Sequence, residues 1–185
     1  LDKMEGIYVP FFLYDYNSDM FYRGEGTKVK TWSSGSYRYT ETSYYSIVRD
    51  MDADFDKVPV DASIKMDDKT MGLLEPFNYK EVENYQDKYL SGFYGEKYNM
   101  GEEVLEPRAL AKVKADSEDL LKSTISGYST VRTIEQRINA RKKRDHYALL
   151  PVWEYIFGYQ GQSYKFHVNG QTGKVVGEYP IDKGK

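Results

Sequence analysis

The sequence predicts an α+β fold, in which an antiparallel β-sheet from N- and C-terminal hairpins has two central helices packed on it. Strand-like patterns stand at both ends of the chain, and amphipathic helical patterns lie between them. The chain has 185 residues, 40% of them hydrophobic, which is enough for one core. We therefore expect a single α+β domain over residues 1–185, with hairpins at 6–32 and 146–179 and a helical insert over about 80–126.

The N-terminal hairpin is predicted from two apolar and aromatic runs, 6–16 and 20–32, which the turn-forming stretch 17–19 separates. A further run over 37–55 is rich in β-branched and aromatic residues and predicts one long or broken strand. The stretch 61–78 has no clean period, which indicates a loop with room for one helical turn.

Two helices are predicted in the centre of the chain. Residues 81–97 place Val82, Tyr85, Tyr89 and Phe93 at spacings of three and four, which forms one stripe of an amphipathic helix. A second helix is predicted over 101–126, opened or kinked by Pro107 and capped by Gly127. The side chains expected on its buried face are Leu110, Val113, Leu120, Leu121 and Ile125.

The C-terminal part predicts a three-stranded meander over 147–159, 162–169 and 174–179. Gln160 and Gly161 can supply the positive φ that a two-residue turn needs. The stretch 128–143 fits either a helix or a strand; its β-branched residues favour a strand, paired with 147–159 across a basic turn. Residues 8–14 and 149–155 share the spacing of proline, aromatic residue and tyrosine, which indicates either a duplicated hairpin or chance similarity.

The composition limits the classes of partner. The net charge is −3, so no global field points to nucleic acid, and any basic site must be local. The chain has no cysteine, which excludes disulfides and thiolate metal sites within it, and we expect no cofactor in this chain. No apolar run approaches the roughly 20 residues that cross a bilayer, and no signal peptide is recognised, so we expect a cytoplasmic protein without a membrane partner.

A basic segment is the sharpest polar feature. It contains five cations in eight residues: Arg137, Arg141, Lys142, Lys143 and Arg144. At a turn beside an aromatic sheet, these cations could bind nucleic acid phosphates, while the alternative is a solvated turn. The 19 tyrosines suit half-buried sheet faces, although tyrosine rings also stack on bases.

An enzyme is the third hypothesis. The loop residues Asp61, Asp67, Asp68 and Glu75 are rich in carboxylates and could serve a hydrolase. On one strand face Ser163 and His167 would lie about 13 Å apart, too far for proton transfer. A deep pocket that joins Asp61 or Asp67 to a histidine would argue against a non-enzymatic role.

Two further motifs are weighed and set aside. Asp50, Asp52, Asp54 and Asp56 resemble the start of a calcium loop, but Phe55 stands where the sharp turn requires glycine. An acidic face on an edge strand accounts for the same alternation. The loop 169–174 superficially resembles a phosphate loop, but it lacks the first glycine and leads into a strand.

Several segments resemble the C-terminal part of bacterial proteins that carry an N-terminal TFIIB-type zinc ribbon and are often labelled as related to the primosomal replication-restart helicase. The segments are YVPF (8–11), VPVDAS (58–63), EPF (75–77), YLSGF (89–93), YALLPVW (147–153), YKF (164–166) and NGQTGKVVGE (169–178). No helicase motif is present among them. The resemblance implies a zinc ribbon upstream of Leu1 and assigns almost nothing about function. The leading hypothesis is a non-enzymatic binding or scaffold domain that acts through its loops and sheet surface, with protein or nucleic acid as its partner.

Overall fold

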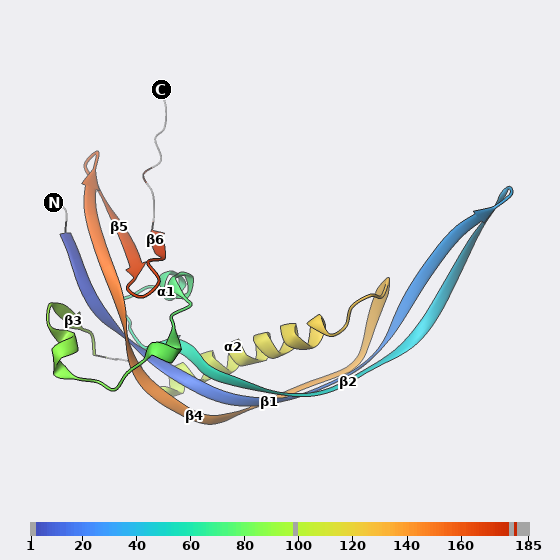
Figure 1. Cartoon of the computed structure of the whole chain (residues 1–185), viewed down its shortest axis with the longest axis horizontal. Helices are drawn as coiled ribbons and strands as arrows, with labels where there is room; N and C mark the ends of the chain where they lie inside the picture. Colours follow the sequence, from blue (N-terminus) through green and yellow to red (C-terminus); the bar gives the residue numbers. More distant parts are fainter. Residues whose placement is uncertain (1–2, 98–99, 178–179, 181–185) are drawn as a thin grey trace. The chain divides into compact units, whose positions relative to one another are not determined.

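The computed structural model describes residues 3–97, 100–177 and 180, and strands dominate them (Figure 1). The elements are, in order, β1 (Lys3–Ser34), β2 (Tyr37–Asp61), α1 (Asp68–Leu74), η1 (Tyr79–Glu81), η2 (Asp87–Leu90), β3 (Phe93–Gly95), α2 (Glu102–Ser123), β4 (Thr130–Tyr159), β5 (Gln162–Asn169) and β6 (Val175–Gly177). The α+β expectation is therefore wrong. The chain is mostly antiparallel sheet, and α1 and α2 are the two α-helices of the described residues.

The strands form one sheet in the order β2-β1-β4-β5-β6. β4 and β5 are antiparallel, as are β5 and β6, whereas the short β3 pairs with β1 in parallel. A tight turn with Gly35 at φ +61° joins β1 to β2, so these two strands are antiparallel as well. β1 and β4 also run antiparallel, because Thr27 lies beside Thr130 whereas Phe12 lies beside Tyr147.

The turn predicted at 17–19 is wrong, because β1 runs without interruption through it. The hairpin expected over 6–32 is therefore not formed. Asn17 donates its side-chain amide to Asp52 (2.9 Å) and to Asp54 (3.1 Å) on β2. Asparagine often ends a strand, but here the amide of the Asn17 side chain is bonded to the neighbouring strand, so β1 continues.

The contacts divide the chain into two compact units. Unit 1 holds Leu1–Leu13, Pro59–Pro107 and Asp145–Lys185, and unit 2 holds Tyr14–Val58 and Arg108–Arg144. The boundaries fall inside β1, β2, β4 and α2, since each of these elements contributes residues to both units.

The core of unit 1 joins β1 and β4 to α1 and to the segment that follows it. Its buried side chains are Val9, Phe11, Leu13, Met66, Met71, Leu74, Phe77, Ala148, Leu150 and Val152. Asp67 caps α1 by accepting from Thr70 N (2.9 Å). Burying these side chains against each other supplies the main stabilisation of the unit.

The helix predicted over 81–97 is wrong. That stretch contains the 3-10 turns η1 and η2 and the short strand β3. Gly92 takes φ +84°, which ends the helical pattern, and Phe93 packs its ring on Gly6 and against Tyr8 (4.9 Å between ring centroids). Pairing with β1 therefore replaces helix formation.

The core of unit 2 lies between α2 and one sheet face. Met20, Tyr22, Ile47 and Leu121 are buried together. The helix predicted over 101–126 is confirmed as α2, but its buried stripe is 105-109-113-117-121 and leaves Leu120 exposed. Ser117 donates its hydroxyl to Ser18 (2.9 Å) inside this interface. Searching the described part of the chain finds no helix long and apolar enough to cross a membrane.

The C-terminal meander is confirmed as β4, β5 and β6. Gln160 and Gly161 take φ +50° and +78°, as the two-residue turn requires. The last run, predicted over 174–179, is observed as Val175–Gly177, and positions 178 and 179 lie outside the described residues.

Candidate functional site

The five predicted cations lie on β4 and not at a turn, because β4 continues through the whole segment from Thr130 to Tyr159. The predicted pairing of 128–143 with 147–159 is therefore wrong, since both stretches belong to one strand. The segment pairs with β1 instead, where acidic side chains face it. We call residues 137–144 the basic segment.

The cation nearest to a buried acid is Arg144. Its Nε donates to Asp15 on β1, and the hydrogen bond raises the pKa of the Arg144 guanidinium. Asp15 is only 2% exposed and also accepts from the backbone N of Lys57 (2.7 Å). Lys57 has φ +57°, so Asp15 holds an irregular point of β2 as well as pairing with Arg144.

Arg141 and Lys143 are also paired. Arg141 donates to Asp19, and Lys143 donates to Asp54 of β2 at 2.8 Å. The hydrogen bond with Asp54 raises the pKa of Lys143, and the same bond, assisted by Asn17, lowers the pKa of Asp54. β2 is an edge strand of the sheet and carries the alternating acidic residues Asp50, Asp52, Asp54 and Asp56. The interpretation of this alternation as an acidic face on an edge strand is therefore confirmed.

The two remaining cations lie over aromatic rings. The Arg137 guanidinium lies 4.8 Å from the centre of the Phe21 ring, and its Nε lies 3.1 Å from Glu135. Lys142 Nζ lies 5.9 Å from the centre of the Tyr14 ring. The basic segment is therefore electrically compensated by its own sheet, although most of its side chains remain exposed to solvent.

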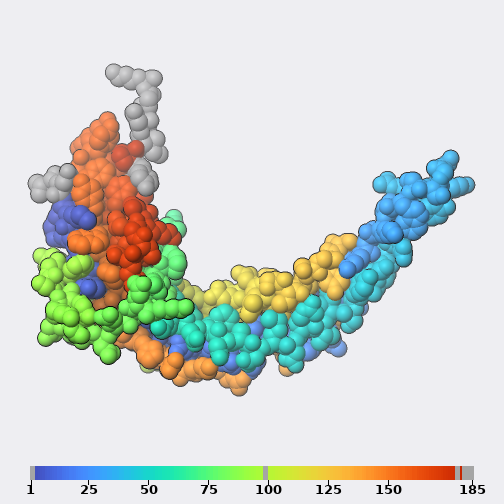
Figure 2. All heavy atoms as spheres, viewed as in Figure 1, coloured from blue at the N-terminus to red at the C-terminus, as the bar shows by residue number. Residues whose placement is uncertain are grey.

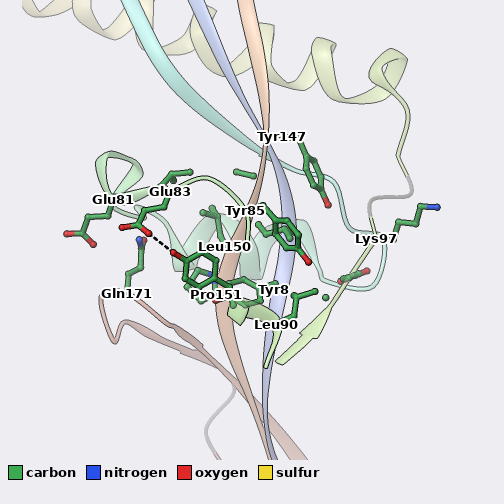
Figure 3. A pocket seen from close by; sticks show the side chains of 16 residues that line it. Tyr8, Glu81, Glu83, Tyr85, Leu90, Lys97, Tyr147, Leu150, Pro151 and Gln171 are labelled. Carbon is green, nitrogen blue, oxygen red and sulfur yellow. Dashed lines mark hydrogen bonds between the residues drawn. The ribbon is translucent and has the colours of Figure 1, made fainter. Parts of the chain in front are cut away.

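Unit 1 contains a cleft of about 710 Å³ that sequence reasoning did not predict (Figure 3). One wall comes from the segment between α1 and α2, and the floor comes from β1 and β4. We call it the tyrosine cleft. Its lining residues are Tyr8, Glu81, Val82, Glu83, Tyr85, Tyr89, Leu90, Gly95, Glu96, Lys97, Tyr147, Ala148, Leu149, Leu150, Pro151 and Gln171.

Hydrogen bonds fix the acidic side chains of this cleft. Tyr89 donates its hydroxyl to Glu83 Oε2 (2.6 Å), a bond drawn in Figure 3. Glu96 is 9% exposed and accepts from Ser63 Oγ (2.7 Å). The carboxylate of Glu96 is thereby held at the cleft in a fixed position.

Two tyrosines of the cleft, Tyr85 and Tyr89, stay neutral at physiological pH. The hydrogen bond to Glu83 raises the pKa of Tyr89, and burial together with Asp87 raises the pKa of Tyr85. A phenol whose pKa is raised donates hydrogen bonds and offers a ring face, but it is a poor nucleophile. The chemistry of the cleft is therefore suited to binding.

The cleft wall is fastened to the C-terminal meander. Gln171 accepts from Asn78 N (3.0 Å) and donates to Asn78 O (3.4 Å). Lys174 Nζ donates to Glu75 O (2.7 Å), and the buried Asn169 donates to Leu74 O (3.0 Å). The loop 169–174 is thus a clamp for the segment after α1, and it connects the antiparallel strands β5 and β6 as a hairpin loop.

A second, polar depression of about 670 Å³ brings Asp67 and His167 to one surface of unit 1. Asp67 is engaged as the cap of α1, and its hydrogen bonds to Thr70 lower its pKa. His167 Nε2 lies 3.1 Å from Glu154, and burial lowers the pKa of the imidazole despite that carboxylate. Both candidate groups are committed to structural partners, so their proximity does not form a catalytic pair.

No group of three or more histidine, cysteine or acidic side chains among the described residues is placed to hold an ion. The residues predicted as a carboxylate-rich loop are dispersed: Asp61 ends β2, Asp67 caps α1, Asp68 is the first residue of α1, and Glu75 follows it.

The tyrosine cleft was missed because its residues come from four separate stretches of sequence. Only the pairing of β3 with β1 brings 81–97 onto the strands. The spacing of Val82, Tyr85 and Tyr89 predicts a buried helix face, so it does not indicate a cleft. An excess of tyrosine was the one usable signal.

Comparison with known proteins gives one informative relative. No protein-family profile matches the chain, and no solved structure matches it. The chain is 40% identical, over all of its 185 residues, to the uncharacterized protein YdjG of Bacillus subtilis (strain 168). The match covers 54% of that protein, so the chain spans about half the length of the curated relative it matches.

Proposed function

We propose that the chain is a non-enzymatic binding domain that receives a segment of a partner protein in the tyrosine cleft. The observation that carries this proposal is the combination of ring faces and carboxylates around an apolar floor. Tyr8, Tyr85, Tyr89 and Tyr147 supply the rings, and Leu150 and Pro151 belong to the floor. Clefts with this mixture bind ligands through buried apolar groups and a few oriented polar ones.

The charge of the cleft selects the kind of segment. The lining includes Glu81, Glu83, Glu96 and Lys97, so it carries three acidic groups and one basic group. A polypeptide with an apolar side chain beside a lysine or arginine complements this surface, because its cation can lie over a ring or against a carboxylate. We therefore propose a basic and apolar segment as the ligand.

Selection from a random peptide library tests the proposal. Enriched peptides should pair lysine or arginine with a large apolar residue, and Tyr85→Ala should weaken their binding about tenfold or more, as expected for an aromatic hot spot. Tyr94→Ala is the matched control, since Tyr94 is 68% exposed and lies outside the cleft lining. A selection without enrichment, or peptides that bind Tyr85→Ala as well as the wild type, would refute the proposal.

Nucleic-acid binding by the basic segment remains a weaker alternative. Arg141, Lys143 and Arg144 would have to exchange Asp19, Asp54 and Asp15 for phosphates. The pairs of Arg141 and Lys143 are exposed and therefore weak, so their exchange is feasible. Exchange at Arg144 would take the Arg144 cation away from the buried carboxylate of Asp15, and the net local field is small. A hydrolase has less support, because Asp67 and His167 already have structural partners.

We also propose, from the sequence resemblance, that the domain accompanies an N-terminal TFIIB-type zinc ribbon. From the lack of an apolar run long enough to cross a bilayer, we further propose that it works in the cytoplasm. The relative of greater length leaves room for further domains. Zinc analysis of the full-length protein tests the first point, and cell fractionation tests the second. Stoichiometric zinc that is lost when the upstream region is deleted would support the ribbon.

A further inference from the structure

The hairpin formed by β1 and β2 extends beyond the start of β4, the strand that pairs with β1 on its other side. β4 begins at Thr130, where Ser129 N donates to Thr27 O (2.6 Å) and the Thr27 and Thr130 hydroxyls lie 2.5 Å apart. From there to the turn, β1 and β2 form a two-stranded ribbon over residues 28–45, nearly all of it exposed. We call it the aromatic ribbon; it includes the light-blue tip in Figure 2.

One face of the aromatic ribbon alternates rings with lysines. Trp32 and Tyr39 stack with ring centroids 5.6 Å apart and an angle of 15°. Lys30 Nζ lies 5.8 Å from the centre of the Trp32 ring, and Lys28 Nζ lies 5.3 Å from that of Tyr45. The opposite face is different, since Thr31 and Thr40 approach each other there at 3.5 Å.

This ring-bearing face continues the face that is buried elsewhere in unit 2. Tyr128 covers Gly26, where an added Cβ would lie 2.5 Å from the ring, and Tyr128 also contacts Tyr45 (5.8 Å). Past Tyr128 the cover ends. Trp32, Tyr39 and Tyr37 are then 43%, 44% and 71% exposed, so a face built like a core face is open to a ligand.

The charge of the aromatic ribbon favours an anionic ligand. Lys28, Lys30 and Arg38 stand against Glu41, which gives three cations and one anion, or +2, in a chain whose net charge is −3. Within the part of the chain that the structure describes, these three cations have no ion pair. The basic segment, in contrast, is compensated by carboxylates.

We propose that the ring-bearing face of the aromatic ribbon binds single-stranded nucleic acid. Bases stack on Trp32 and Tyr39, and backbone phosphates lie against Lys28 and Lys30. Tyr37 and Tyr39 alternate onto the same face of β2, so strand geometry places them about 7 Å apart, a spacing that suits unstacked bases. The site does not depend on the tyrosine cleft, which lies in the other unit.

A lipid surface is the main competing occupant, and the composition of the face argues against it. The aliphatic side chains near this region, Val29 and Val48, alternate onto the opposite face. Interfacial segments insert through aliphatic and aromatic side chains together, whereas this face carries charged Lys28, Lys30 and Glu41 among its rings and no aliphatic side chain. Duplex nucleic acid is disfavoured because its bases are already stacked on each other.

Tryptophan fluorescence provides the test. The chain has two tryptophans, so the Trp153→Phe variant leaves Trp32 as the single reporter. Titration of this variant with oligothymidylate should quench the Trp32 emission saturably, because a stacked base deactivates the indole. The affinity should fall with salt on a log–log slope of about −1.4, which corresponds to two phosphates on a single strand.

Variants of the full chain locate the site by fluorescence anisotropy of a labelled oligothymidylate. Trp32→Ala and Tyr39→Ala should each weaken binding by about 5-fold to 150-fold, the range expected for loss of one stacked base. The Lys28→Gln, Lys30→Gln double variant should bring the salt slope towards zero. Tyr44→Ala is the matched control: it removes a ring that is 77% exposed on the opposite face and should leave binding unchanged.

Three outcomes would overturn the proposal. The first is absence of saturable quenching in the variant that retains Trp32. The second is unchanged binding by Trp32→Ala together with loss of binding by Arg141→Ala, which would assign the ligand to the basic segment. The third is a blue-shifted Trp32 emission with phosphatidylglycerol and phosphatidylcholine vesicles but no response to oligothymidylate, which would identify a lipid surface.

Discussion

Replacing Asn169 with alanine should loosen the clamp that holds the wall of the tyrosine cleft. Asn169 is 1% exposed; its amide donates to Leu74 O (3.0 Å), and its oxygen accepts from the backbone N of Gln171 (2.9 Å) and Thr172 (3.0 Å). The Leu74 carbonyl would lose a buried partner, whereas the two amides lie at the surface and can bond to water. Together these losses amount to about 2–4 kcal/mol of unfolding free energy.

Urea unfolding measures the loss of unfolding free energy, and amide hydrogen exchange measures the loss of the hydrogen bonds from the Gln171 and Thr172 amides. Asn169→Ala should lower the unfolding midpoint and speed the exchange of the Gln171 and Thr172 amides. Asn169→Asp retains the acceptor but places a carboxylate against Leu74 O, so it should destabilise as much while the two amides stay protected. The matched control is Asn139→Ala, at an exposed position of β4, with an expected change within about 0.5 kcal/mol.

The reasoning fails if Asn169→Ala unfolds at the same urea concentration as the wild type. It also fails if the exchange of Gln171 and Thr172 is unchanged, because those amides would then be protected by something other than the Asn169 side chain. Loss of peptide binding in Asn169→Ala, with Asn139→Ala unaffected, would in addition connect the clamp to the tyrosine cleft.

Three further predictions concern stability. Burial lowers the pKa of His167, so the unfolded chain binds more protons than the folded chain, and the unfolding free energy should fall as the pH drops below about 6.5. The His167→Gln variant should flatten this pH dependence. The control variant His146→Gln, at an exposed position, should retain it. Equal pH slopes for the wild type and His167→Gln would contradict this. Asp15→Ala should cost about 1–3 kcal/mol in chemical denaturation, because Lys57 N loses its acceptor; a loss no larger than that of an exposed aspartate would exclude the role. Leu121→Ala should cost about 2–5 kcal/mol by leaving a cavity under α2, and an unchanged melting temperature would show that the helix is not packed as described.

The sequence by itself determined the features that depend on local backbone chemistry. The turn at Gln160 and Gly161 follows from residues that accept positive φ, and the strand after it follows from alternation of polar and apolar side chains. The helix α2 was predictable because a spacing of three and four between apolar residues recurs along it. The absence of cysteine likewise fixed the absence of disulfides.

Only the tertiary structure decided how long the strands are. Asn17 and the basic segment look like turns in isolation, but Asp52, Asp54, Asp15 and Asp19 satisfy their polar groups from neighbouring strands. A polar stretch can continue as a strand because side chains more than 30 residues away in sequence bond to its polar groups. A pattern of neighbouring residues contains no information about such partners. A distant partner also decides the structure of 81–97: β3 pairs with β1, and the Phe93 ring packs on Gly6. This pairing forms the tyrosine cleft from a stretch that has the apolar spacing of a helix.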